Sequence, residues 1–84
     1  MVRVVFFAGV REQLDCAGLE IPWQPGLDTL RDLEQWLIEN RGPQWASVLA
    51  QDNLIRALNH RVSDLDAPIS DGDEVAFYPP VTGG

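Results

Sequence analysis

The two most apolar stretches of this chain lie at its two ends, and this placement limits the folds that its 84 residues can adopt. One stretch covers residues 2–8 and the other covers residues 74–78, and both are rich in the β-branched and aromatic residues that are typical of strands. A chain this short buries only about 60 to 65 % of its unfolded surface and supports one thin core. The two terminal stretches are therefore expected to be neighbouring central strands of one small sheet.

One long helix is predicted between these strands, at residues 29–40. Thr29 is a suitable N-cap with Asp32 three positions later, and the Gly42-Pro43 pair ends the helical pattern. Four apolar residues fall on one stripe of this helix: Leu30, Leu33, Trp36 and Leu37. So small a domain needs the stripe for its core, although such a stripe is also found on helices that bind partners.

Shorter elements fill the rest of the chain. Gly9 is expected to end the first strand, and a single helical turn is predicted at residues 10–14. Further strands are predicted at residues 19–23, 54–58 and 61–63, with a brief helix at residues 45–49 and turns at Pro25-Gly26 and Asp71-Gly72. This order predicts an α+β fold, in which a mixed sheet carries one main helix on one face and leaves the other face open.

The alternation of side chains along a strand indicates which residues lie on the open face. The set that points toward the helix comprises Val2, Val4, Phe6, Val75 and Phe77. The outward set comprises Arg3, Val5, Phe7, Ala76 and Tyr78. Phe7 and Tyr78 are then exposed aromatic residues of the kind that mark an interface, unless a loop folds over them.

The charge balance favours a protein partner. Thirteen acidic and six basic residues give a formal net charge of −7, so nucleic-acid binding is not expected. Such acidity steers a domain toward a basic protein surface, or only keeps it soluble. All six basic residues are Arg, which excludes conjugation of the chain to its own lysines, although a bias toward Arg codons explains the same composition.

Metal chemistry and a membrane location are not expected. Cys16 is the only cysteine, and His60 is the only histidine and has no evident carboxylate partner in a catalytic motif. The acidic stretch after residue 63 fails the EF-hand pattern, because Ile69 stands where a loop starting at Asp64 requires glycine. No apolar run approaches the roughly 20 residues needed to span a bilayer. We therefore expect a cytoplasmic protein.

The last six residues, Pro79-Pro80-Val81-Thr82-Gly83-Gly84, indicate the chemistry. Proline cannot donate ladder hydrogen bonds, so strand pairing stops and an extended tail with a reach of roughly 13 to 14 Å beyond Pro80 is expected. Two glycines without Cβ atoms can thread a narrow channel, although terminal glycines are also common as unstructured ends. A terminal carboxylate is a poor electrophile, so it needs activation, such as adenylation by ATP, before sulfur attacks it.

Two segments resemble the small-subunit family of molybdopterin synthase: DGDEVAFYPPVTGG at residues 71–84 and VRVVFFAGVRE at residues 2–12. The resemblance implies a ubiquitin-like β-grasp domain at residues 1–78 followed by an extended tail at residues 79–84. It also implies that Gly84 is adenylated by a ubiquitin-activating-like adenylyltransferase that uses ATP with Mg, and is then thiocarboxylated. The sulfur would pass to cyclic pyranopterin monophosphate to form the molybdopterin dithiolene.

The same resemblance implies how the carrier binds its partner. Gly83, Val81 and Thr82 correspond to the tail that enters the large subunit, within a heterotetramer of two small and two large subunits. The residues that correspond to the docking surface are Phe7, Val62, Tyr78, Pro79 and Pro80. The chain itself would hold no cofactor or metal and would be the non-catalytic subunit of a sulfur transferase.

Three other functions remain open at this stage. A carrier of the same fold serves thiamine thiazole or cysteine synthesis, and a ubiquitin-like modifier forms isopeptide bonds with lysines of other proteins. A plain interaction domain with an irrelevant tail is the third. Only the PPVTGG ending and the first strand favour molybdopterin.

Overall fold

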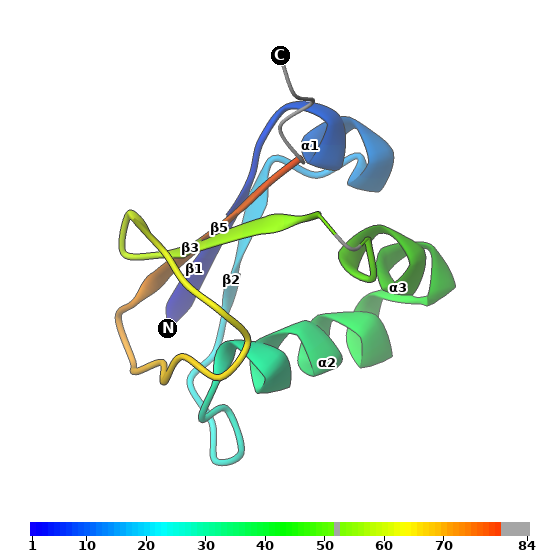
Figure 1. Cartoon of the computed structure of the whole chain (residues 1–84). Coiled ribbons are helices and arrows are strands. Elements are labelled where there is room, and N and C mark those ends of the chain that lie inside the picture. Colours follow the sequence, from blue (N-terminus) through cyan, green and yellow to red (C-terminus); the bar gives the residue numbers. More distant parts are fainter. Residues whose placement is uncertain (52, 80–84) are drawn as a thin grey trace.

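A computed structural model describes residues 1–51 and 53–79 of the chain (Figure 1). In this part of the chain a five-stranded sheet has the order β2-β1-β5-β3-β4. The elements are β1 (Val2–Phe6), α1 (Ala8–Leu14), β2 (Gly18–Ile21), α2 (Leu30–Arg41), α3 (Pro43–Leu49), β3 (Ile55–Leu58), β4 (Arg61–Val62) and β5 (Glu74–Tyr78). No helix among the described residues is long and apolar enough to cross a membrane.

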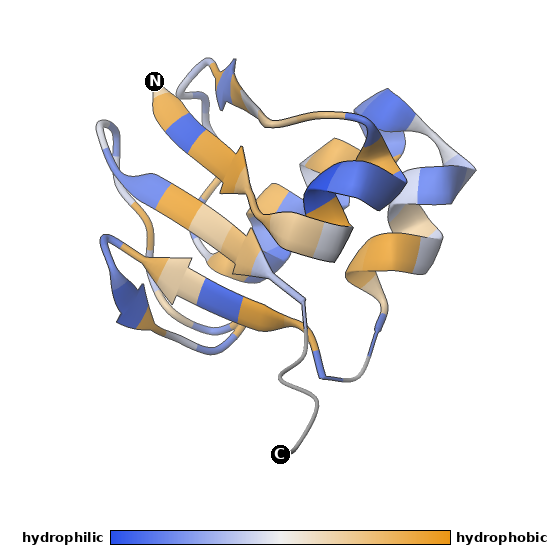
Figure 2. Ribbon diagram, turned by 90° about the horizontal axis from the view of Figure 1, so that it is seen from above, coloured by the Kyte–Doolittle hydropathy of each residue, from blue (hydrophilic) through white to orange (hydrophobic). Residues whose placement is uncertain are grey.

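The centre of the sheet is formed by β1 and β5, as the sequence predicts. These two strands run parallel with Phe6 opposite Phe77, whereas the other neighbouring strands are antiparallel. Figure 2 shows that hydrophobic residues are concentrated along these two central strands. Because both central strands run the same way, Met1 lies at one end of the sheet and Tyr78 at the other.

Helix α2 covers one face of the sheet. Its N-terminus is a capping box, in which the Thr29 hydroxyl accepts from the Asp32 amide at 3.3 Å and the Asp32 carboxylate accepts from the Thr29 amide at 3.1 Å. Leu30, Leu33 and Leu37 are fully buried beneath the sheet. Trp36, also expected on the stripe, is only partly buried at the edge of the core.

The corner between β1 and α1 differs from the prediction. The strand ends at Phe6, and α1 is a seven-residue helix that starts at Ala8 and includes Gly9. Ala8 has a positive φ of 48°, which turns the chain sharply after an extended Phe7. Only Val10 and Leu14 of this helix are buried. The apolar pattern in the sequence is therefore too short to indicate the full length of α1.

Other boundaries shift for local reasons. Strand β2 ends at Ile21 rather than residue 23, because Pro22 has no amide hydrogen for the ladder. Helix α3 starts at Pro43, since the proline that ends one helix occupies the favoured first position of the next. Strands β3 and β4 form a tight hairpin in which Asn59 and His60 both have positive φ.

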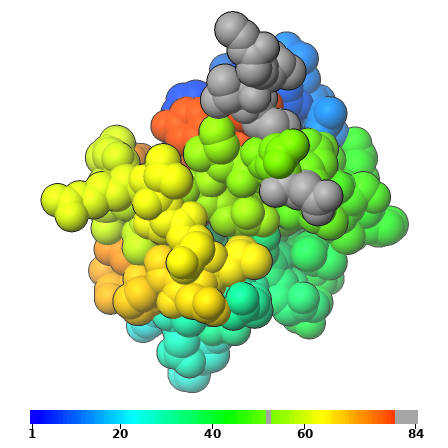
Figure 3. All heavy atoms as spheres, in the orientation of Figure 1, coloured from blue at the N-terminus to red at the C-terminus, as the bar shows by residue number. Residues whose placement is uncertain are grey.

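The loop between β4 and β5 packs against the start of α2 (Figure 3). The amides of Leu30 and Arg31 donate to the carbonyls of Ala67 and Leu65 at 3.1 and 3.0 Å. Ile69 from the same loop is buried in the core. The acidic segment is therefore held along part of its length by backbone hydrogen bonds to the helix that covers the sheet.

Candidate docking face and tail exit

The sheet face opposite α2 is the candidate site, and we call it the open face. Its members follow the predicted alternation: Val4, Phe6, Val75 and Phe77 are buried toward α2, while Val5, Ala76 and Tyr78 are only partly buried. Phe7 retains 40 % of its surface and Val62 retains 80 %. A small domain thus leaves apolar side chains on this face that a core would normally cover.

Phe7 and Tyr78 are stacked on each other. Their ring centroids are 4.7 Å apart and the two planes differ by 3°. The Phe7 amide also donates to the Phe77 carbonyl at 3.1 Å, which continues the ladder between the two central strands. Tyr78 is therefore less exposed than the sequence suggested, because one face of its ring is covered by Phe7.

Val62 lies on the open face at the outer edge of the sheet. It pairs with Ala57, which in turn pairs with Ala76 of β5. Directly opposed residues on antiparallel strands share a face, so these three side chains point to the same side as Tyr78. The structure brings Val62, Phe7 and Tyr78 onto one surface; strand alternation predicted this face for Phe7 and Tyr78, and the family resemblance implied it for all three.

A shallow hollow of about 210 Å³ adjoins the stacked rings, lined by Val5, Phe7, His60, Glu74, Ala76 and Tyr78. His60 places its Nε2 atom 3.2 Å from a carboxylate oxygen of Glu74. The β3–β4 hairpin brings His60 beside Glu74, and the Asn59 amide donates to the Glu74 carbonyl at 2.8 Å. The sequence did not reveal this partner, because the two residues come together only in the folded chain. The open face therefore has a polar border beside its aromatic centre.

The tail begins at the end of β5. Tyr78 is the last strand residue, and Pro79 is the last residue of the chain that the structure describes. A Cβ atom on Gly9 would lie 3.9 Å from the Pro79 Cβ, so the first turn of α1 borders the start of the tail. Pro80, Val81, Thr82, Gly83 and Gly84 lie outside the described residues, so their predicted roles and the boundary at residue 79 stay predictions.

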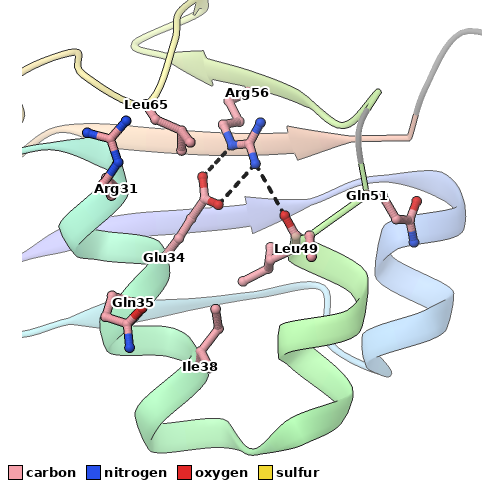
Figure 4. A pocket seen from close by; sticks show the side chains of 9 residues that line it. Arg31, Glu34, Gln35, Ile38, Leu49, Gln51, Arg56 and Leu65 are labelled. Atoms are coloured by element: carbon pink, nitrogen blue, oxygen red, sulfur yellow. Dashed lines mark hydrogen bonds and ion pairs between the residues drawn. The ribbon is translucent and has the colours of Figure 1, made fainter.

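A second, larger hollow of about 390 Å³ lies between α2, α3 and β3 (Figure 4). Glu34 and Arg56 form a two-pronged ion pair there, and Arg56 also donates to the carbonyls of Leu49 and Leu54 at 3.2 and 3.3 Å. Burial raises the pKa of Glu34, and the Arg56 guanidinium offsets part of that rise. Because both side chains are fully partnered, this pair ties the helical layer to the sheet and leaves no group free for a ligand.

This ion pair was not predicted from the sequence. Glu34 follows Leu33 on the buried side of α2, and Arg56 points toward the helix because it lies opposite Phe77. Charged residues at such positions are ordinarily assigned to solvent. Within residues 1–51 and 53–79, no cluster of three or more metal-ligating side chains is present.

Comparison with known proteins places the chain in a family. A family model described as the ThiS family matches residues 4–84. The molybdopterin synthase sulfur carrier subunit of Escherichia coli (strain K12) is 39 % identical over 84 residues, which is 100 % of both chains. Such identity over the full length confirms the resemblance that the two ends of the sequence indicated.

Solved structures agree on the fold. A chain in the protein–protein complex of subunits 1 and 2 of molybdopterin-converting factor from Helicobacter pylori 26695 has a TM-score of 0.67 and 28 % identity, with 99 % of this chain and 97 % of that chain covered. SAMP1 from Haloferax volcanii has a TM-score of 0.76 and 22 % identity, with 99 % and 98 % covered. These likenesses confirm the expected ubiquitin-like β-grasp fold, and the chain described above belongs to the ThiS family.

Proposed function

We propose that this chain is the sulfur carrier subunit of a molybdopterin synthase and that the carboxylate of Gly84 carries the sulfur. One observation supports this most directly. Strand β5 ends at Tyr78, whose ring stacks on Phe7, and the chain continues as Pro-Pro-Val-Thr-Gly-Gly. An apolar face for docking and a terminus of two glycines are therefore joined directly. The full-length similarity to a sulfur carrier subunit from Escherichia coli supports the same function.

The chemistry begins with activation of the terminal carboxylate. A Gly84 carboxylate oxygen attacks the α-phosphorus of ATP, with Mg, on an adenylyltransferase related to the ubiquitin-activating enzymes, and pyrophosphate leaves. Sulfur from a donor then attacks the acyl carbon and AMP leaves, which produces the thiocarboxylate. The proposed role of this chain is to present that group to the large subunit.

Docking on the large subunit would use the open face. Phe7, Val62 and Tyr78 would supply apolar contact area, and Pro79 and Pro80 would belong to the same docking surface. Val81, Thr82 and Gly83 then enter the catalytic channel, where Gly84 donates sulfur to cyclic pyranopterin monophosphate. Two carriers and two large subunits form the proposed heterotetramer, and the complex of subunits 1 and 2 from Helicobacter pylori supports a partner of this kind.

Mass spectrometry tests the carrier function. Incubation with ATP, an activating enzyme and a sulfur source is expected to raise the mass of the chain by about 16 Da, because one oxygen is replaced by sulfur. A variant lacking Gly84 is the matched control and is expected to remain unchanged. An unchanged wild-type mass, under conditions that charge the Escherichia coli carrier, would contradict the proposal.

The identity of the captured partner tests the pathway. Immobilised carrier is expected to retain a molybdopterin synthase large subunit that converts cyclic pyranopterin monophosphate. Retention of a thiazole synthase or a cysteine synthase in its place would assign the chain to another carrier pathway. A ladder of higher-mass adducts in cell extract would instead indicate a protein modifier.

A further inference from the structure

We propose that Phe7 is a positioning residue for sulfur transfer, acting through Tyr78 to set the direction in which the tail leaves the sheet. This role is separate from any contact that Phe7 makes with the partner, and it rests on the proposed function. The inference comes from where Phe7 lies. Its amide bonds to the carbonyl of Phe77, and its ring stacks on Tyr78, the last strand residue before the tail.

The contacts on Tyr78 come from two sides. The Phe7 ring covers one face of the Tyr78 ring at 4.7 Å with nearly parallel planes, and the Phe7 amide holds the Phe77 carbonyl at 3.1 Å. On the other side, Tyr78 pairs with Ile55 of β3. Tyr78 is therefore held between β1 and β3, and the Phe7 ring contacts it from the β1 side.

Phe7 is itself anchored in the fold. It is the N-cap of α1, and its carbonyl accepts from the amides of Val10 and Arg11 at 3.2 and 3.4 Å. Val10 is buried in the core, so the first turn of α1 cannot shift without disturbing that core. Because the backbone of Phe7 is anchored in this way, its ring can limit the movement of the Tyr78 ring on which it stacks.

Support at Tyr78 affects the tail because the ladder ends there. Pro79 has no amide hydrogen, and proline restricts its own φ to about −65°. The backbone direction set at Tyr78 is therefore passed on to Pro79, and the proposal is that this direction affects how the reacting group is presented. A reacting group displaced by about 1 Å can lose roughly 100-fold in rate, so loss of this support should slow the chemical step.

Docking and positioning predict different kinetics. A residue that only contributes contact area weakens binding, and its loss is overcome at saturating partner concentration. A positioning residue lowers the rate within the saturated complex. The two roles of Phe7 can therefore be separated by replacing it with a side chain that keeps apolar area but cannot stack.

The experiment uses full-length carrier in its thiocarboxylate form, made by ammonium sulfide cleavage of an intein fusion so that the activating enzyme is bypassed. The rate of sulfur transfer to cyclic pyranopterin monophosphate is measured in a single turnover with saturating large subunit, as the loss of about 16 Da from the carrier, because each molybdopterin takes its two sulfurs from two carriers. Phe7→Leu is expected to lower this rate about tenfold, whereas Phe7→Tyr, which restores a flat ring, stays near wild type. Trp23→Leu is the matched control, because Trp23 is an aromatic residue of similar exposure that lies outside the open face, and it is expected to leave the saturated rate unchanged.

A double variant adds an independent readout. Phe7→Leu and Tyr78→Leu each remove the same stack, so the saturated rate of the double variant is expected to equal that of the slower single variant. Multiplying effects would indicate two independent contacts and would overturn the proposal. Unfolding curves of all variants check that each is folded at the assay temperature.

The outcomes separate the two proposals. A wild-type rate for Phe7→Leu at saturation, with active wild-type carrier, overturns the positioning role alone. Thiocarboxylated wild type that yields no product with a large subunit active toward the Escherichia coli carrier overturns the proposed function and the positioning role together.

Discussion

The two faces of the sheet are built from the same strands but differ in what their side chains contact. On the face under α2, Phe6 and Phe77 are stacked at 5.6 Å, Trp45 meets Phe6 edge to face, and almost no surface of the two phenylalanines remains exposed. On the open face, Phe7 and Tyr78 make a similar aromatic pair, yet 40 % of Phe7 is exposed. A stacked aromatic pair between β1 and β5 is thus found once in the core, and a similar pair is found once at the surface.

This difference between the two faces indicates that stability and partner recognition are separable in this domain. Alternate residues of β1 and β5 serve one or the other, so adjacent positions should respond differently to the same substitution. The predictions below test this separation by comparing the two faces, beginning with the largest expected effect on stability.

Phe77→Ala is expected to destabilise the fold by about 3 to 5 kcal/mol, because it removes a buried ring and leaves a cavity. Tyr78→Ala, at the next position, is expected to cost about 1 kcal/mol, since its ring is only partly buried. Urea unfolding of both variants measures the difference. Equal losses would show that the open face also carries the fold.

Arg56→Met is expected to cost about 3 kcal/mol at pH 7, because it leaves the Glu34 carboxylate buried without its partner. Replacing both residues, as Glu34→Leu with Arg56→Met, should recover most of this loss. Urea unfolding of the single and double variants provides the measurement. A double variant as unstable as the single one would mean that the pair does more than neutralise a buried charge.

The Arg56→Met variant also has a predicted pH dependence. Burial raises the pKa of Glu34 above 4.5, and removing Arg56 raises that pKa further. A raised folded-state pKa means that stability is present below the unfolded value and is lost as the pH rises through the folded value. The gap in stability between wild type and Arg56→Met should therefore narrow as the pH falls from 7 toward 4.5. A constant gap across this range would contradict the assignment to Glu34.

Thr29→Ala is expected to cost about 1 kcal/mol, because the capping hydroxyl on the helix that covers the core is lost. Thr29→Ser retains the hydroxyl and is the matched control. Thermal unfolding followed by circular dichroism measures both. Equal losses in the two variants would assign the effect to the methyl group rather than to the cap.

Val62→Asp is expected to change stability by less than about 0.5 kcal/mol, since its side chain is mostly exposed. The same substitution should weaken binding to the large subunit about tenfold or more, because it places a charge within an apolar contact. Calorimetry with a recombinant large subunit tests the second part. Unchanged affinity would remove Val62 from the docking surface.

Local signals in the sequence predicted much of this fold. Thr29 with Asp32 marked the helix start, and β5 has the predicted bounds, since short-range patterns determine caps and strand periodicity. The alternation that placed Phe7 and Tyr78 on the open face is likewise local. Features that depend on long-range packing were misjudged, including the start and length of α1, which is held by core burial of Val10 and Leu14.

The positions of Phe7 and Tyr78 on the open face were predictable from the sequence, but their contacts were not. Phe7 and Tyr78 are 71 positions apart and their stacking follows from the parallel register of β1 and β5, which no local pattern specifies. The Glu34–Arg56 and His60–Glu74 pairs likewise join residues from different elements. Charged residues have no periodic signal that distinguishes a buried ion pair from a solvated surface.

The parallel arrangement of β1 and β5 has a practical consequence for work on this carrier. Since Met1 and Tyr78 lie at opposite ends of the sheet, a fluorophore or affinity tag attached ahead of Met1 would be separated from the Phe7–Tyr78 stack by the length of the central strands. Labelled carrier could then report on successive handovers between enzymes without a bulky group at the terminus that has to enter them.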